Sequence, residues 1–460
     1  MNGYKVLLVN PLHLGGLRFI REGRCAQTSK IWRTIWPPFS LASIGAVLEK
    51  EGAIVKICDC PAENLGLESF LSLIKRFEPR LVIMNSATPS IESDLAVCSL
   101  IKQNFSQTKI GMFGIHVTIF PEECFKKCEE LDFIIRGEPE FTVKDLVASL
   151  NREGSLNVIE GLSWRQSGKV IHNKGREFID NLNELPVPAW HLLDISKYRL
   201  PLLRKPYLII SPARGCGHKC SFCNAQLYYG AKRRNRPVVN VIEEIKICLK
   251  QFQVEDFLFW TENFTSDREY LEELLSEIIK SRVRIRWVCN SRVDNIDFEL
   301  LKKMKKAGCW MISFGVESGN QCILDNVNKG ITLGQIKKAF TETEKAGIET
   351  VSNCMFGLPG ETKQTINITN KFVKELSPTF AQFYCAVPRP GTEFYNLAKA
   401  NNWINQNSWD GFLQEKSVLN INGLRDIEIM KLRRKALIEF YLRPVAILKI
   451  LRFFLKSFKK

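Results

Sequence analysis

Three cysteines, Cys216, Cys220 and Cys223, lie within eight residues of one another near the middle of the chain. Their C-x3-C-x2-C spacing lets one loop direct three sulfur atoms at one centre. Thiolates are soft ligands that bind zinc, copper(I) or iron–sulfur clusters. A closed zinc site takes four ligands, and an iron–sulfur cluster is normally held by four cysteines. Three cysteines therefore predict a cluster with one iron open to another ligand. The alternatives are a zinc site, with His218 beside the sulfurs, or inert thiols.

Phe222 directly precedes the third cysteine, and with it the loop resembles the signature of the radical S-adenosylmethionine (SAM) enzymes. In that family the open iron of a 4Fe-4S cluster chelates SAM, and reduction cleaves SAM to a 5′-deoxyadenosyl radical. The resemblance implies that Cys216, Cys220 and Cys223 are the metal ligands and the catalytic residues, and that Phe222 offers its ring to the adenine. It also implies an external one-electron reductant of the flavodoxin or ferredoxin type.

Strands and helices alternate after residue 206 and predict how this loop is positioned. The expected strands are 207–210, 256–260, 285–289, 310–314, 350–355 and 379–384, and the expected helices include 241–252, 268–281, 298–307, 333–346 and 365–376. Six βα units form a partial (β/α) barrel, a fold that places its chemistry at the carboxyl ends of the strands. The basic loop 232–237 is predicted to be solvated, with phosphates of a cofactor or substrate as the alternative.

Polar residues follow several of these barrel strands. Glu262 suits the ammonium of SAM, Arg292 can pair with its carboxylate, and Glu317 can accept from a ribose hydroxyl. Segments 314–319 and 356–362, the second of which contains Gly357, resemble motifs of radical SAM barrels. We therefore predict Glu262, Arg292, Glu317 and Gly357 as SAM-binding residues.

The first 150 residues predict a doubly wound, Rossmann-like parallel sheet. Near-continuous apolar runs separated by helices are typical of such sheets, which bind ligands at the carboxyl ends of their strands. The expected strands are 4–9, 54–58, 81–84, 109–113 and 133–135, and the expected helices are 40–50, 67–77, 91–104, 122–128 and 141–150. Ser40 is the expected N-cap of the first helix.

The loops after these strands, followed by residues 136–140, resemble the cobalamin-binding domain that precedes the barrel in many radical SAM enzymes. The resemblance implies that Ser86, Thr88 and Gly114, being small, leave room for the nucleotide tail of cobalamin. His116 is predicted to serve the loop or the corrin edge, with local hydrogen bonding as the alternative. A Rossmann-like domain without a cofactor is the alternative for the whole region.

His13 stands where some cobalamin proteins have a cobalt-ligating histidine. A metal-ligating histidine usually donates its second nitrogen to a carboxylate, and this motif has Pro11 in place of the aspartate. We therefore expect His13 to be a loop histidine, with cobalt ligation as the alternative.

The composition of the chain indicates a globular protein of a reducing cytoplasm. The 460 residues carry a net charge of +16, with 45% hydrophobic and 25% charged residues. Fifteen cysteines, odd in number and scattered, do not favour disulfides. Neither a signal peptide nor an apolar stretch of the roughly 18 residues that a membrane span needs is evident.

The C-terminal tail concentrates the positive charge. Residues 431–460 contain ten Lys or Arg against one acid, Glu439. After Pro444, the residues Lys449, Arg452, Lys456 and Lys460 recur at helical spacing and share one face, while apolar residues cover the rest. This pattern predicts either a helix lying peripherally in a membrane interface, on the inner face of the membrane, or a helix docked on the barrel with its cations in water.

The expected division is a cobalamin-binding domain at 1–150, a hairpin and linker at 151–200, the radical SAM barrel at 201–400 and a helical extension at 401–460. The resemblance, over residues 5–396, implies methylation of an unactivated carbon of a small-molecule or lipid-like substrate. The enzyme alternative is a cyclase or mutase acting on a porphyrin or polycyclic lipid. Alternatives of other classes are an RNA-modifying protein and a non-catalytic cobalamin sensor. Nucleic acid is not favoured, because the cysteine-bearing N-terminal domain and C-terminal β-barrel of tRNA methylthiolating relatives are missing.

Overall fold

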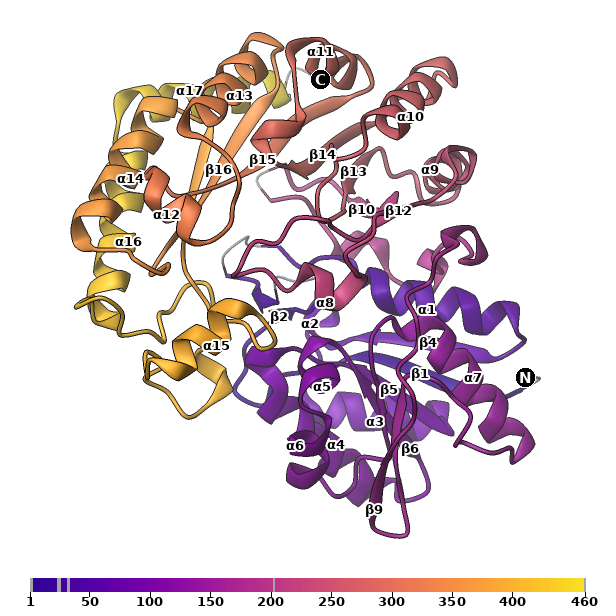
Figure 1. Ribbon diagram of the computed structural model, residues 1–460. Coiled ribbons are helices and arrows are strands. Elements are labelled where there is room, and N and C mark those ends of the chain that lie inside the picture. Colours follow the sequence, from indigo (N-terminus) through magenta and orange to yellow (C-terminus); the bar gives the residue numbers. More distant parts are fainter. Residues whose placement is uncertain (1–2, 23–25, 31–33, 202, 459–460) are drawn as a thin grey trace. The chain divides into compact units, whose positions relative to one another are not determined.

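The computed structural model describes residues 3–22, 26–30, 34–201 and 203–458. It consists of two compact units, and Figure 1 labels many of their helices and strands. The first unit contains residues Met1–Pro206 and two short pieces from further along the chain, Ala225–Gly230 and Ser408–Asp410. The second unit contains Tyr207–Asn224, Ala231–Asn407 and Gly411–Lys460.

A seven-stranded sheet in the order β4-β1-β5-β6-β7-β8-β9 forms the centre of the first unit. The strands are β1 (Lys5–Asn10), β4 (Ile54–Asp59), β5 (Leu81–Asn85), β6 (Lys109–Phe113), β7 (Phe133–Ile135), β8 (Leu162–Gln166) and β9 (Lys169–His172). The first five pair in parallel and are almost completely buried, because helices cover both faces. The predicted doubly wound sheet is confirmed.

The helices of this unit follow the strands as expected. They are α1 (Phe39–Lys50), α2 (Cys60–Glu63), α3 (Leu67–Phe77), α4 (Ile91–Asn104), α5 (Ile115–Ile119), α6 (Pro121–Lys127) and α7 (Pro139–Arg152). The prediction that Ser40 caps α1 is wrong. Pro38 occupies the cap position, and the Ser40 hydroxyl donates instead to the buried Glu22 carboxylate at 2.9 Å.

The hairpin β8–β9 extends the first sheet, although the sequence placed it in a bridge between domains. Strand β8 pairs antiparallel with β7, so that Phe133 lies opposite Trp164. An unpaired parallel edge would expose a row of backbone donors and acceptors, and the hairpin supplies partners for them. The following linker is also packed: the Ala189 N–H donates to the Ala42 carbonyl of α1 at 2.9 Å, and Trp190 is buried.

The second unit contains a six-stranded parallel sheet in the order β10-β13-β14-β15-β16-β17, which confirms the partial barrel. Its strands are β10 (Tyr207–Ile210), β13 (Asp256–Phe259), β14 (Arg286–Ser291), β15 (Cys309–Glu317), β16 (Glu349–Phe356) and β17 (Phe380–Cys385). The intervening helices are α9 (Val238–Phe252), α10 (Arg268–Lys280), α11 (Phe298–Lys306), α12 (Gln321–Asn326), α13 (Leu333–Lys345) and α14 (Lys363–Leu376).

Side-chain caps fix where most of these helices begin, just beyond the strand ends. In α10, α11, α12, α13 and α14 the residue before the helix accepts a backbone N–H from the first turn; these caps are Asp267, Asp297, Asn320, Thr332 and Thr362. Such caps satisfy donors that the helix itself leaves unpaired. They set the length of each loop that carries a candidate site residue.

The chain ends in helices α15 (Glu393–Ala400), α16 (Asp426–Tyr441) and α17 (Pro444–Phe458). Helix α16 covers the open edge of the barrel at β17. The Tyr441 hydroxyl donates to the Ala381 carbonyl at 2.9 Å, and Arg433 Nε donates to the Phe383 carbonyl at 2.6 Å. Within the described residues, no helix is both long enough and apolar enough to cross a membrane.

Candidate active site

The cysteine loop begins and ends on a small two-stranded ribbon. Strand β11 (Ala213–Arg214) precedes it and pairs antiparallel with β12 (Arg234–Asn235). Two backbone hydrogen bonds anchor its middle: Ser221 N–H donates to the Val327 carbonyl at 3.0 Å, and Phe394 N–H donates to the Ser221 carbonyl at 2.9 Å. The loop is therefore held by the barrel at three places.

Cys216, Cys220 and Cys223 are half-buried, whereas ten of the eleven other described cysteines are fully buried. Among the described residues, no three His, Cys, Asp or Glu side chains lie close enough together to hold one metal ion. A cluster takes one thiolate per iron, so its ligands stand further apart than those of a single ion.

Glu262 lies against the start of this loop. Glu262 follows β13, and its side chain is buried. Its carboxylate accepts the Gly215 N–H at 3.2 Å. Gly215 has a φ of +93°, a conformation that favours glycine. Glu262 thus fixes the turn that leads into Cys216, a positioning contact that the sequence did not predict.

Arg292 follows β14 and approaches the second cysteine. Its Nη1 lies 3.9 Å from Cys220 Sγ, while Nε and Nη2 bind the two oxygens of Asp294 at 2.9 and 2.8 Å. Nη2 also donates to the Lys329 carbonyl at 2.8 Å. The guanidinium is therefore held in one plane beside the cysteine loop, with Nη1 as the nitrogen directed towards it.

Glu317 forms a buried ion pair with Lys329, whose Nζ lies 2.7 Å from the carboxylate. The same ammonium lies 5.9 Å from the centre of the Phe222 ring, within cation–π range. Glu317 has a φ of +62°, and a Cβ on Gly315 would lie 2.5 Å from its carboxylate oxygen. The predicted residues Glu317 and Phe222 are thus joined through Lys329, which sequence reasoning missed.

Gly357 begins the turn after β16 with a φ of +97°. Its N–H and that of Leu358 donate to the Glu361 carboxylate at 2.6 and 3.1 Å. Burial raises the pKa of Glu361 to about 8, although the two backbone donors oppose this shift. Gly357 therefore belongs to a turn closed by a buried carboxyl group.

The cations of the basic loop are turned inward. Arg233 Nη1 donates to the Asn263 carbonyl and to the Ser266 hydroxyl, both at 2.7 Å. Arg236 pairs with buried Glu244 at 2.5 Å, and Arg234 is buried. The prediction of a solvated loop is therefore wrong for these three arginines, because the loop is part of the β11–β12 ribbon.

In the first unit, Ser86, Thr88 and Gly114 lie together at the carboxyl ends of β5 and β6. The Ser86 N–H and hydroxyl both donate to the Phe113 carbonyl at 2.9 Å, which draws the two strand ends together. Gly114 has a φ of +128°, and a Cβ there would lie 2.2 Å from the Ser86 carbonyl oxygen. Only glycine fits at this position.

His116 is buried behind this turn between two aromatic rings. Its ring meets Phe120 at 5.3 Å and Trp409 at 5.0 Å, both edge-on, and Trp409 Nε1 donates to Glu123 at 3.3 Å. Burial lowers the pKa of His116 to about 4, so the imidazole is neutral at physiological pH. No residue of the described chain hydrogen-bonds to its Nδ1.

His13 lies in the loop after β1, where its Nδ1 accepts the Gly15 N–H at 3.1 Å. A neutral imidazole has one protonated nitrogen and one acceptor. Because Nδ1 accepts, the proton is on Nε2, which then has no lone pair for a metal. This hydrogen bond favours the predicted loop role over the cobalt-ligand alternative.

Two family descriptions match the chain: the radical SAM superfamily over residues 210–373 and the B12 binding domain over residues 32–147. A protein of Pyrococcus horikoshii named as an uncharacterized methyltransferase is 33% identical over 416 residues, which cover 90% of each chain. The chain belongs to the cobalamin-binding radical SAM enzymes.

This radical SAM enzyme is also similar to a cyclase and to a methyltransferase of known structure. The anaerobic magnesium-protoporphyrin IX monomethyl ester cyclase of Rubrivivax gelatinosus is 29% identical over 367 residues, 78% of this chain and 66% of that protein. The structure of the radical SAM methyltransferase TsrM from Kitasatospora setae aligns with a TM-score of 0.71 and 18% identity, over 88% of this chain and 76% of that one. The second similarity shows a shared fold.

The three cofactors predicted from the sequence, a 4Fe-4S cluster, SAM and cobalamin, are those of this family, and the predicted enzyme class is confirmed. The local structure of this radical SAM enzyme fits them. Its half-buried cysteines contrast with the buried ones elsewhere. Small residues close the strand ends of the B12-binding sheet, and Gly114 lets the ends of β5 and β6 approach closely, because a Cβ there would collide with the Ser86 carbonyl oxygen.

Polar residues that were not among the predicted site residues end three strands of the B12-binding sheet. They are Asn10 of β1, Asp59 of β4 and Asn85 of β5. Asn10 donates to Asp59 at 3.5 Å, and the Tyr198 hydroxyl donates to the same carboxylate at 2.9 Å. The available signal was a polar residue closing each apolar run, which is where such sheets meet their ligands.

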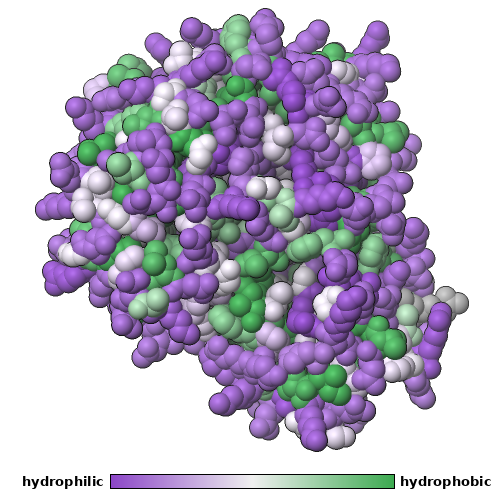
Figure 2. All heavy atoms as spheres, in the orientation of Figure 1, coloured by the Kyte–Doolittle hydropathy of each residue, from purple (hydrophilic) through white to green (hydrophobic). Residues whose placement is uncertain are grey.

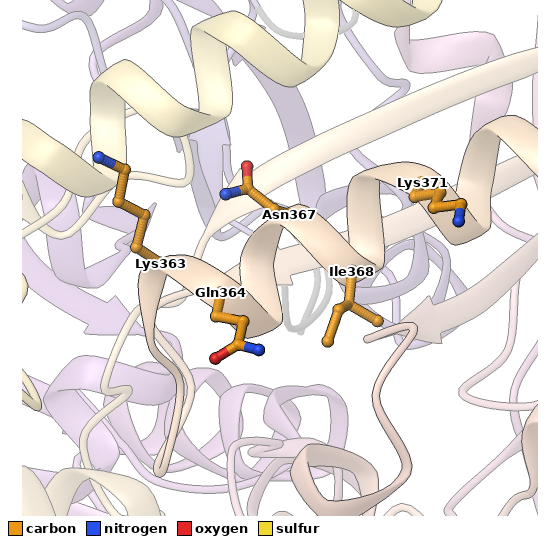
Figure 3. A pocket seen from close by; sticks show the side chains of 5 residues that line it. All are labelled: Lys363, Gln364, Asn367, Ile368 and Lys371. Atoms are coloured by element: carbon orange, nitrogen blue, oxygen red, sulfur yellow. The ribbon is translucent and has the colours of Figure 1, made fainter.

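A shallow surface hollow in the radical SAM unit is separate from these groups. Figure 3 shows the side chains that line it, all from α14; they are Lys363, Gln364, Asn367, Ile368 and Lys371. A binding site needs polar groups converging from several elements. This hollow is therefore not a candidate active site.

Proposed function

We propose that this radical SAM enzyme methylates an unactivated carbon of a small-molecule or lipid-like substrate. The observation that carries the proposal is the presence of two features in one chain: the half-buried cysteine loop of the barrel and the tight, small-residue turn of Ser86 and Gly114 at the strand ends of the B12-binding domain. When bound, the cluster and SAM supply radical chemistry and cobalamin supplies methyl transfer.

In this proposal Cys216, Cys220 and Cys223 hold the cluster, and Glu262 and Arg292 keep their loop in place. Glu262 does so through the Gly215 N–H, and Arg292 through its approach to Cys220. Both contacts are made by buried side chains on barrel loops. The loop is thereby organised by the protein itself.

Lys329 and Glu317 are proposed to bind the polar groups of SAM. Their ion pair lies beside Phe222, so a cation and an anion are presented next to an aromatic ring. The Lys329 ammonium suits the carboxylate of SAM and takes in this proposal the place predicted for Arg292, whose Nε and Nη2 bind Asp294. Glu317 suits a ribose hydroxyl, as predicted. Phe222 offers a face to the adenine.

The cofactor part of the proposal is tested by reductive SAM cleavage in anaerobically reconstituted protein. Cys220→Ala is expected to reduce 5′-deoxyadenosine formation to background. Cys322→Ala, which changes an exposed cysteine outside the loop, is the matched control and should retain wild-type activity. Wild-type activity in the Cys220→Ala variant would disprove the assignment of the loop.

The transfer reaction is tested with methyl-labelled SAM, a one-electron reductant and extracts that contain candidate substrates. Label in a recovered product supports methylation. Ring closure is the second candidate, because the chain is similar to the cyclase of Rubrivivax gelatinosus. A product without label, formed only with intact protein, would replace methylation by that candidate.

A soluble one-electron donor and the substrate are the partners that a radical SAM enzyme requires. We further propose a peripheral membrane contact through the C-terminal helices. It rests on their charge and exposure, which are described next.

A further inference from the structure

Helix α17 exposes apolar side chains on the face turned away from its unit. Leu448, Leu451 and Leu455 are 53%, 52% and 64% exposed, and their spacing of three and four residues places them in one row. Ile447 flanks the row, and Leu442, just before the helix, is 71% exposed. We call these five residues the α17 outer face.

The opposite side of α17 is firmly docked, which fixes the direction of this face. Phe453 is buried and stacks on Trp310 with a ring distance of 5.7 Å. Lys449 Nζ donates to the Ser377 carbonyl at 2.6 Å and pairs with Glu344 at 2.7 Å. Because α17 is already docked through its opposite side, the exposure of the outer face does not come from an undocked helix.

This arrangement corrects one detail that both sequence-based alternatives for the tail share, namely the exposed position of Lys449. Lys449 was expected beside Arg452 on a solvated basic face, but it is turned towards the barrel, while Arg452 is exposed. The side chains of Lys456 and Lys460, predicted on the same face, lie outside the described residues. The helix is docked as in one alternative, yet it leaves its leucines outside.

The concentration of apolar residues here is unusual for this chain. Of sixteen exposed large hydrophobic side chains among the described residues, seven lie between Ile438 and Leu455. Single exposed leucines are ordinary, but a contiguous group marks an interaction surface. Elsewhere, on the face of the molecule shown in Figure 2, hydrophobic atoms form small separate patches among hydrophilic ones.

The charge around the outer face selects the kind of partner. Residues 431–460 carry ten basic residues and one acid, and the acid, Glu439, is paired with Lys374 at 2.5 Å. On α16, Lys431, Arg434 and Lys435 are exposed. A two-fold contact with a second copy would bring these like charges together, whereas anionic lipid is complementary to them.

We propose that the α17 outer face docks peripherally on an anionic lipid bilayer, with its leucines at the boundary between headgroups and acyl chains. An apolar helix face bordered by cations is typical of interfacial helices. The proposal concerns where the enzyme binds and does not depend on the reaction that it catalyses.

The position of α17 on the barrel determines which end of the barrel faces the bilayer. Phe453 packs on Trp310 near the start of β15 and on Phe380 at the start of β17, at the amino ends of the strands. The cysteine loop follows β10 at its carboxyl end. The outer face therefore anchors the enzyme and does not itself deliver a lipid to the site.

The test is co-sedimentation of the full-length protein with vesicles of phosphatidylglycerol and phosphatidylcholine, compared with phosphatidylcholine alone. We expect binding to the anionic vesicles only. Changing Leu448, Leu451 and Leu455 together to Ser should weaken that binding roughly tenfold or more. Arg452→Gln should weaken it about fivefold, since one basic residue is lost near the surface.

The matched control changes three exposed aliphatic residues on other helices of the same unit, Val239, Ile368 and Leu397, to Ser. It should bind like wild type. Light scattering of all variants measures self-association, and 5′-deoxyadenosine formation shows that each variant is folded. Because Cys220→Ala should lose cleavage but keep vesicle binding, failure of the proposed reaction is distinguishable from failure of docking.

Three outcomes would overturn the proposal. Equal loss in the control variant would show that the leucines have no special role. Equal binding to neutral vesicles would remove the charge argument. A dimer that the leucine variant dissolves, without vesicle binding by wild type, would make a second copy the occupant.

Discussion

At the carboxyl ends of the barrel strands, charged side chains pair with one another around the cysteine loop, whereas at the carboxyl ends of the B12-binding sheet small residues set the shape. Arg292 and Lys329 exemplify the first, and Gly114 and Ser86 the second. SAM is a small molecule that carries both positive and negative charges. Cobalamin is large, so the strand ends of the sheet must leave room for it. We therefore predict that charge pairing controls the affinity of the barrel for SAM. In the B12-binding sheet, we predict that the shape of the strand ends controls the uptake of cobalamin.

The largest expected effect is at Gly114, where the comparison is sharpest. Gly114→Ala places a Cβ 2.2 Å from the Ser86 carbonyl oxygen, so the strand ends must separate. Cobalamin retained after reconstitution, measured from its visible absorption, should fall to background while cluster iron is unchanged.

Gly168→Ala, in the turn between β8 and β9, is the matched control for Gly114→Ala. Gly168 also has a positive φ, +79°, but a Cβ there would meet nothing within 4 Å. The control includes the cost of a left-handed alanine, about 1–2 kcal/mol, without a collision. If both variants lose cobalamin equally, backbone strain is responsible and not the collision with the Ser86 carbonyl oxygen.

The next effect concerns charge in the barrel. Lys329→Met removes the ammonium that lies 2.7 Å from Glu317 and faces Phe222. Hydrogen bonds to charged groups contribute about 1.5–3 kcal/mol, so KM for SAM should rise roughly tenfold to a hundredfold. Lys329→Arg should recover part of this loss.

Lys337→Met is the control for Lys329→Met, since Lys337 lies at the surface 3.7 Å from Glu375. It should leave KM for SAM unchanged. A normal KM in Lys329→Met would mean that the buried pair only stabilises the fold, and unfolding measurements would then show the whole effect.

Lys329 also shows what the sequence could not reveal. Cysteine spacing identifies a loop directly, and apolar periodicity predicted α3, α4, β6 and β7 to the residue. A buried lysine has no local pattern, because its partner Glu317 is reached only when β15 and the segment after α12 fold together. The same holds for Arg292 and Cys220, which are 72 residues apart.

Helix ends and the sheet edge were harder to predict for a related reason. The hairpin β8–β9 has a clear turn at residues 166–168, but its pairing with β7 depends on an edge that exists only in the folded sheet. Likewise, Ser40 has the composition of a cap, yet buried Glu22 takes its hydroxyl. In both cases, contacts between residues far apart in the sequence determine the local structure.

A smaller effect is expected on stability. The pKa of Glu361 is raised by burial to about 8 from its ordinary 4.5, so the folded state binds a proton that the unfolded state releases between these values. The contribution to the unfolding free energy is complete below about pH 4.5 and is lost as the pH rises through about 8. The slope is at most about 1.4 kcal/mol per pH unit.

Glu361→Gln keeps the shape of the side chain and removes the titration. Denaturant unfolding of this variant should therefore depend less steeply on pH across that window. Glu22, whose pKa burial raises to about 7, remains in both proteins, so the difference between them isolates Glu361. An identical pH dependence in wild type and variant would contradict the raised pKa.

The last prediction is that a substitution at His13 causes no change in bound cobalamin. It tests most directly how the B12-binding sheet holds this cofactor. If shape and not ligation holds cobalamin, His13→Ala should leave the visible spectrum of bound cobalamin unchanged. The Nδ1 of His13 accepts the Gly15 N–H at 3.1 Å, which leaves the proton on Nε2 and no lone pair for cobalt. The pKa of His13 is lowered by burial, so the neutral ring prevails at physiological pH. Spectra of wild type, His13→Ala and Gly114→Ala should be compared at equal protein concentration. A shifted band in His13→Ala at full cobalamin content would mean that the loop opens on binding and that His13 reaches the metal.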